Sequence, residues 1–148
     1  DPTSPPTAST ETIGCTRSRW LPAKALERHA AREQAGGDLV AQFDAQLAGE
    51  IPAGTWDALP EFETGAKVAT RKSSQAVLNA IADALPQLLG GSADLAGSNG
   101  TTLKSFGHLA PGEFGADRRN VHYGVREHGM GSIMNGLSLH GGIRPYAG

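Results

Sequence analysis

The stretch VHYGVREHGMGSIMNG, residues 121–136, constrains the fold of this chain more than any other segment. It opens as a short β-type run, passes through Gly124 and then becomes helical in period. The apolar residues of the helical part recur three or four positions apart: Met130, Ile133, Met134 and Leu137. Glu127 is therefore predicted in the first turn of a helix that follows directly on a strand. In open α/β sheets, ligands bind outside the carboxyl ends of strands, so this segment predicts a ligand site.

The same helix carries three glycines, Gly129, Gly131 and Gly136. Each glycine disfavours a helix by roughly 1 kcal/mol relative to alanine. A helix that keeps three of them is expected to pack very closely against another part of the protein.

The elements around this segment predict an α/β fold with a parallel sheet. Residues 71–85 have a helical stripe that ends before Pro86, and residues 88–91 suit a short buried strand. A long glycine-rich connection follows over residues 92–120, and a last strand begins at Ile143. This α-β-loop-β-α-β order leaves at least one edge of a parallel sheet open, as in half of a domain.

The first part of the chain predicts helices and turns. Residues 1–19 are rich in Pro, Thr and Ser, and we expect a disordered lead because they cannot offset their ordering entropy. Residues 23–35 have the composition of a helix, and Asp38 can cap a second helix through Leu47. The turns after it are acidic, which is typical of a solvated face, although a strap between domains fits as well.

Composition excludes several classes of function. The formal net charge of −2 and the isoelectric point near 6.2 give no reason to expect nucleic acid or an anionic membrane as partner. No apolar run is long enough to span a membrane, and the start lacks the regions of a signal peptide. Cys15 is the single cysteine, so the natural expectation is a reducing, cytoplasmic compartment.

Three segments carry a resemblance to a known family. They are YGVREHGM with the following IMNGLSLHGG in the last third of the chain, GGSADLAGSN at residues 90–99, and ATRKSSQ at residues 69–75. Together they resemble the pyrimidine-binding domain of transketolases. The resemblance assigns residues 67–148 to the N-terminal half of that domain and residues 20–66 to a helical interdomain connection.

The resemblance implies a function for the complete enzyme. Transketolases of the pentose phosphate pathway move a two-carbon ketol unit from a ketose phosphate to an aldose phosphate. They use thiamine diphosphate and a divalent metal, Mg or Ca, and they act as homodimers. In proteins with this motif, the glutamate at the position of Glu127 meets N1′ of the aminopyrimidine and shares a proton with it. Without the flanking motif, Glu127 would be an ordinary glutamate in the first turn of a helix.

The resemblance also implies roles for residues outside the helix. Arg71 and Ser98 correspond to residues that bind the phosphate of the sugar substrate, and an arginine fork matches phosphate oxygens well. By residue type alone, Arg71 fits equally a surface arginine and Ser98 a loop serine. Asp94 is expected to order its loop or a subunit interface. Gly97 stands where many relatives have proline, which loosens the loop.

Other parts of the family pattern are absent from the sequence. Transketolases hold the diphosphate and the metal with a Gly-Asp-Gly…Asn motif in a separate domain, and this chain lacks that motif. We therefore expect the isolated chain to be inactive unless complementing transketolase segments or a partner supply it. The alternatives are a catalytically silent assembly module and a truncated gene product. A deoxyxylulose-phosphate synthase is disfavoured by the SADL and RKSSQ blocks.

Histidines raise the question of a metal site in this chain. Their spacing matches no common metal-ligand motif, so packing or solvated roles are expected for His108, His122, His128 and His140.

Overall fold

The computed structural model describes residues 20–148, with side chains from residue 26 onward. The disordered lead expected over residues 1–19 lies outside the described residues. The chain divides into two compact units, residues 1–40 and 41–148. Helix α1 (Trp20–Ala35) belongs to the first unit, and α2 (Gly37–Leu47) spans the boundary. Both helices were predicted, but Asp38 lies in the first turn of α2 and not at its cap, because the helix begins at Gly37.

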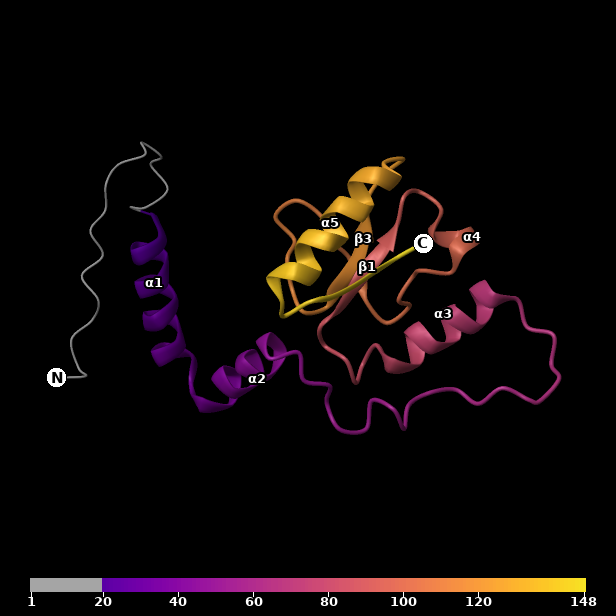
Figure 1. Ribbon diagram of the computed structural model, residues 1–148, viewed down its shortest axis with the longest axis horizontal. Helices are drawn as coiled ribbons and strands as arrows, with labels where there is room; N and C mark the ends of the chain where they lie inside the picture. The colour runs from indigo at the N-terminus through magenta and orange to yellow at the C-terminus, as the bar shows by residue number, and fades with distance from the viewer. Residues whose placement is uncertain (1–19) are drawn as a thin grey trace. The chain divides into compact units, whose positions relative to one another are not determined.

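The second unit is an α/β fold around a parallel sheet (Figure 1). Its elements are α3 (Thr70–Ile81), β1 (Leu88–Ser92), α4 (Ala96–Asn99), β2 (Gly107–His108), β3 (Arg118–His122), α5 (Glu127–His140) and β4 (Arg144–Ala147). The strand order is β2-β3-β1-β4, and every pairing is parallel. Gly90 at the centre of β1 is in register with Asn120 on one side and Tyr146 on the other. The predicted fold class is thereby confirmed.

The connections place helices on both faces of the sheet. The chain moves from β1 to β3 in one direction across the sheet and from β3 to β4 in the other. Because crossovers between parallel strands are right-handed, the two connections lie on opposite faces. One connection contains Leu103 and packs with α3, while the other is α5, which contacts β4 and is drawn in front of the strands in Figure 1.

The core lies on the α3 face. Leu103 is fully buried at 0% exposure and forms a cluster with Ala82, Leu85 and Leu88. Partly buried side chains pack around this cluster: Leu78, Ile81, Phe106 and Tyr146. Arg119 closes one side, with its guanidinium 4.0 Å from the centre of the Phe106 ring and Nη1 donating to the Ala82 carbonyl at 2.7 Å. Of the apolar stripe predicted for residues 71–85, Leu85 is buried in this cluster and Leu78 and Ile81 pack against it, although no residue within α3 is itself buried.

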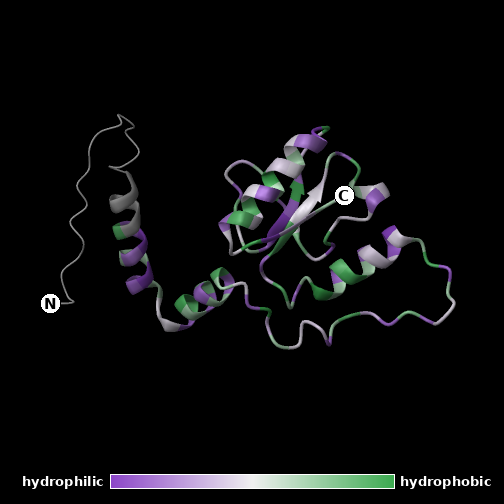
Figure 2. Cartoon of the chain, viewed as in Figure 1, coloured by the Kyte–Doolittle hydropathy of each residue, from purple (hydrophilic) through white to green (hydrophobic). Residues whose placement is uncertain are grey.

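No residue of α5 is buried, as is also true of α3, but the α5 face has no buried cluster among the described residues like the one around Leu103. Of the predicted stripe, Met130, Met134 and Leu137 are half-buried, and Ile133 is 51% exposed. A Cβ added at Gly131 or Gly136 would meet nothing within 4 Å. Figure 2 shows hydrophobic positions along α5 nevertheless. The close neighbour expected for the glycines of this helix is not among the described residues.

Several boundaries differ from the sequence predictions for physical reasons. Helix α3 ends at Ile81 and a turn follows over residues 82–84, so the helix stops before Leu85, the residue that Pro86 disfavours in the helical region. Strand β3 begins three residues before Val121, at polar residues that an apolar pattern does not mark. The glycine-rich connection also contains the short α4 and β2. No helix in residues 20–148 combines the length and apolar character that crossing a bilayer requires.

Candidate functional site

The predicted site residues gather around one edge of the sheet. Because all four strands are parallel, their carboxyl ends share that edge. Asp94 and Ser98 follow the end of β1, and Glu127 follows the end of β3. Arg71 lies in the first turn of α3, a helix that leads into the opposite, amino end of β1. The topology therefore brings segments up to 56 positions apart to one edge.

Glu127 is the first residue of α5, as predicted. Its side chain is exposed and has no hydrogen-bond or ion-pair partner among the described residues. The dry pocket that would bury this carboxyl is not formed by the part of the chain described here. No side chain among the described residues engages the Glu127 carboxylate at the carboxyl edge of the sheet. It is therefore free to share a proton or a hydrogen bond with a ligand.

Ser92, the last residue of β1, organises the loop that carries Asp94 and Ser98. Its buried Oγ donates to the Gly148 carbonyl at 2.6 Å and accepts from the Leu95 amide at 3.1 Å. Asp94 has a positive φ of 68°, which is uncommon for a residue with a side chain. The loop thus leaves the sheet by a sharp turn that sequence patterns did not predict.

Ser98 and Arg71 are exposed on neighbouring segments. The Ser98 hydroxyl donates to the Leu95 carbonyl at 3.0 Å, within its own helical turn. Gly100, with φ of 71°, ends α4 so close to α3 that a Cβ there would lie 2.9 Å from the Arg71 carbonyl oxygen. The structure therefore places the backbone of Arg71 against the end of α4, two residues after Ser98. The Arg71 guanidinium has no partner among the described residues.

A pair of histidines at the same edge was missed by sequence reasoning. His108 ends β2 and His122 ends β3, and their Nδ1 and Nε2 atoms lie 2.8 Å apart. One ring nitrogen must donate to the other, so the pair shares one proton at this contact. The two residues are 14 positions apart, and no pattern signalled that β2 would pair with β3. Within residues 20–148, no cluster of three or more His, Cys, Asp or Glu side chains could hold a metal ion.

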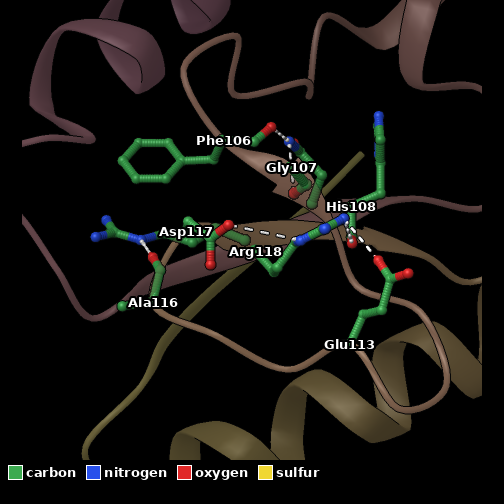
Figure 3. A network of polar contacts seen from close by, with 9 residues as sticks. Phe106, Gly107, His108, Glu113, Ala116, Asp117 and Arg118 are labelled. Carbon is green, nitrogen blue, oxygen red and sulfur yellow. Dashed lines mark hydrogen bonds and ion pairs between the residues drawn. The ribbon is translucent and has the colours of Figure 1, made fainter.

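An ionic network fixes the loop between β2 and β3 (Figure 3). Arg118 Nη1 lies 2.9 Å from Glu113 Oε2 and donates to the His108 carbonyl at 3.3 Å. Arg118 Nε lies 3.6 Å from Asp117 Oδ2. One arginine therefore links the loop to the strand that ends in the histidine pair.

Two tyrosines lie beneath the carboxyl edge. Burial raises the pKa of both hydroxyls, and the proximity of Tyr123 adds to the effect on Tyr146. The Tyr146 hydroxyl donates to the Thr101 carbonyl at 2.8 Å. The Tyr123 hydroxyl is buried and makes no hydrogen bond with the described residues. Both side chains are neutral packing elements at physiological pH.

A separate pocket lies at the opposite edge. Among its lining residues are Gln87, just before β1, and Arg144, the first residue of β4. Gln87 Nε2 donates to the Glu50 carbonyl at 2.8 Å, and Arg144 donates to the Gly49 carbonyl. These bonds hold the segment after α2 against the amino ends of the strands. None of the predicted site residues lines this pocket.

Comparison with known proteins agrees with this geometry. Residues 66–148 match the family described as transketolase, pyrimidine binding domain. The transketolase of Geobacillus stearothermophilus is 48% identical over 126 residues, which are 85% of this chain and 19% of that protein. The structure of a transketolase from Leishmania mexicana superposes with a TM-score of 0.71 at 38% identity, covering 86% of this chain and 19% of that one.

A Pichia stipitis transketolase variant, crystallised with xylulose-5-phosphate, gives a TM-score of 0.71 at 37% identity. That match covers 88% of this chain and 20% of the other. A parallel α/β unit is thus the class of structure that these proteins share with the chain. The chain belongs to the transketolase family, and it spans about a fifth of the length of these relatives.

Proposed function

We propose that this chain is part of a transketolase, which transfers a two-carbon ketol unit from a ketose phosphate to an aldose phosphate. The observation that carries the proposal is the position of Glu127. It is the first residue of α5, exposed at the carboxyl edge of a parallel sheet, within a segment that matches the pyrimidine-binding domain. Residues 67–148 would form the first half of that domain, and residues 20–66 would connect it to another.

The residues present fit one part of thiamine diphosphate, the aminopyrimidine. Thiamine diphosphate, when bound, supplies the carbanion chemistry of ketol transfer. Glu127 would share a proton with the pyrimidine ring nitrogen, and the absence of a partner for its side chain among the described residues supports this role. The residues that would hold the diphosphate and a divalent metal are not in this sequence, because it lacks the Gly-Asp-Gly…Asn motif. A homodimer or complementing transketolase segments would have to provide them.

Arg71 and Ser98 would bind the phosphate of the sugar substrate. Their segments meet at Gly100, and the Arg71 guanidinium is not engaged by any described residue. The Pichia stipitis relative was crystallised with a sugar phosphate, which fits a phosphate site in this family. Asp94 would hold the turn that leads from β1 into this loop. A cytoplasmic location agrees with the single cysteine.

The decisive experiment joins this chain to the segments that its transketolase relatives possess. Hydrogen–deuterium exchange at C2 of bound thiamine diphosphate is then measured for the unmodified protein and for Glu127→Gln. The amide cannot share a carboxyl proton, so exchange should slow by orders of magnitude while the fold persists. Glu61→Gln, an exposed carboxylate of the connection, is the matched control and should exchange normally. Normal exchange in Glu127→Gln would exclude Glu127 from the reaction.

A second experiment tests the phosphate site. Arg71→Ala should raise KM for phosphorylated donors about ten- to a hundredfold, since bonds to charged groups contribute roughly 1.5–3 kcal/mol. Non-phosphorylated donors should be little affected. Lys72→Ala, which removes the neighbouring cation on α3, is the control. Equal effects on both kinds of donor would remove Arg71 from the phosphate site.

The alternative is a catalytically silent module that keeps this fold for assembly with a partner. The exposed apolar side chains of α5 fit such a role as well as they fit the enzyme. If the completed protein binds thiamine diphosphate and exchanges its C2 proton, the silent module is excluded.

A further inference from the structure

The turn between β3 and α5 is tight and is closed by a backbone hydrogen bond two residues long. Gly124 has φ of 67°, and the Arg126 amide donates back to the Gly124 carbonyl at 2.7 Å. Val125, at the tip, is 75% exposed. The chain therefore reverses within three residues immediately before Glu127, and the direction in which α5 starts depends on this turn.

The side chain of Arg126 folds back over the turn. Its Nη1 donates to the Tyr123 carbonyl at 3.0 Å, and a Cβ on Gly124 would overlap the same Nη1 atom. Tyr123 itself is anchored in the sheet, since its amide donates to the Ser92 carbonyl at 3.2 Å and its side chain is 6% exposed. The guanidinium thus connects the beginning of α5 to a fixed point of the sheet.

The backbone of Arg126 begins the helix. Its φ of −150° and ψ of 59° are not helical, and no side chain caps this end of α5. The Arg126 carbonyl accepts the first helical bond, from the Met130 amide at 2.8 Å. One residue therefore both opens the helix and binds the strand, and the next residue is Glu127. Because the Glu127 side chain has no partner of its own among the described residues, only this backbone directs its Cα–Cβ bond toward the carboxyl edge.

We infer that Arg126 is a positioning residue for Glu127. Its bond to the Tyr123 carbonyl fixes the first turn of α5, and thereby the direction of the Glu127 carboxylate over the carboxyl edge. This inference rests on the proposed function, because Glu127 has a reaction to serve only there. Gly124 has no side chain, so the Arg126 guanidinium can lie directly against the turn. A residue with a side chain at position 124 would displace it.

The first test uses the 148-residue chain itself. Amide hydrogen exchange is followed in peptides that cover residues 127–133. Arg126→Ala removes the side-chain bond to the Tyr123 carbonyl and should loosen the first turn of α5. The Met130 amide, which donates to the Arg126 carbonyl, should then exchange about three- to tenfold faster, as expected for the loss of one net hydrogen bond. Arg126→Lys keeps a donor and should recover part of the protection. Lys104→Ala makes the same change of charge elsewhere and should leave these amides unchanged. Unchanged protection of β1 shows that each variant is folded.

The second test uses the completed enzyme of the proposed function. Arg126→Ala should slow C2 exchange about three- to tenfold, while the Kd of thiamine diphosphate changes less than twofold. Arg126→Lys should recover part of the rate. A merely structural role would loosen α5 in the first test and leave the C2 exchange rate unchanged. That result overturns the inference, as does a rise in Kd that accounts for the whole loss of rate.

The two proposals fail in different ways. If Glu127→Gln exchanges the C2 proton at the unmodified rate, the proposed function is wrong whatever Arg126 does. If Glu127→Gln is slow and Arg126→Ala matches the unmodified protein in both tests, the proposed function stands and Arg126 is not a positioning residue.

Discussion

The two faces of the sheet are built differently, although the same four strands form both. On the α3 face, Leu103 is 0% exposed and the central cluster is closed by this chain alone. Neither α3 nor α5 has a buried residue of its own, but the α5 face has no such cluster among the described residues, and Leu139 is 89% exposed. Parallel sheets normally have both faces covered. The comparison teaches that the α3 face stabilises the fold, whereas the α5 face carries the candidate catalytic residue on a lightly packed helix.

The largest effect should come from glycines that differ between the faces. Gly90 alternates with core residue Leu88 and so belongs to the α3 face; a Cβ there would overlap the Tyr146 carbonyl, so Gly90→Ala should cost more than about 4 kcal/mol of unfolding free energy and disrupt the sheet. Gly136→Ala on α5 meets nothing within 4 Å and should stabilise the chain by about 0.5–1 kcal/mol. Urea unfolding followed by circular dichroism measures both. Similar effects of the two substitutions would remove the distinction between the faces.

Truncation of leucines sharpens the same comparison. Leu103→Ala removes a fully buried side chain and should cost about 2–5 kcal/mol. Leu139→Ala removes a side chain that is 89% exposed and should change stability by less than about 0.5 kcal/mol. Urea midpoints, recorded at two protein concentrations, provide the measurement. A large cost for Leu139→Ala would mean that α5 is covered in solution.

The side-chain amides of Asn120 in the sheet and Asn135 on α5 give a third comparison. Asn120, 4% exposed, accepts from the Leu103 amide at 2.8 Å and donates to the carbonyls of Leu103 and Phe106 at 2.9 and 2.7 Å. Asn120→Ala leaves these backbone groups unpaired and should cost about 1–3 kcal/mol. Asn135→Ala, at an exposed position of α5, is the matched control and should be nearly neutral. An equally small cost at both positions would show that water replaces the Asn120 bonds.

The smallest predicted effect is at alkaline pH. Burial raises the pKa of Tyr146, so the native state holds this proton more tightly than the unfolded state does. The stability that results is complete below the ordinary tyrosine pKa of about 10 and is lost as the pH rises above it. Tyr146→Phe should therefore flatten the fall of unfolding free energy above about pH 10, by up to about 1.4 kcal/mol per pH unit.

Urea unfolding between pH 8 and 11 measures this change in slope. At pH 8, Tyr146→Phe should cost about 1 kcal/mol, because it loses the bond to the Thr101 carbonyl. Tyr123→Phe is the control at that pH, since its hydroxyl has no partner to lose among the described residues and the change should be near neutral. An unchanged alkaline slope in Tyr146→Phe would contradict the predicted direction.

Local patterns determined much of the fold. The stripe of α3, the short run of β1 and the strand–glycine–helix order around Glu127 each depend on neighbours within about two helical turns. The existence and order of these elements were therefore predicted, although α3 ends four residues before the predicted bound. Strand β2 and the start of β3 were missed, because Gly107, His108 and Arg118 are in strands through their pairing with neighbours, not through their own pattern. The role of each site residue remains a prediction.

What the sequence determined by itself is the strand, the turn and the helix that present Glu127, together with the family motif. The tertiary structure decided which distant segments meet: Arg71 against Gly100, and His108 against His122. It also decided that the Arg126 guanidinium closes over Gly124, since that contact requires the Tyr123 carbonyl to be held by β1. The physical reason is that the spacing of apolar residues, which predicts a helix or a strand, is a property of neighbouring residues. Strand order and the contacts between distant segments depend instead on how the whole chain packs.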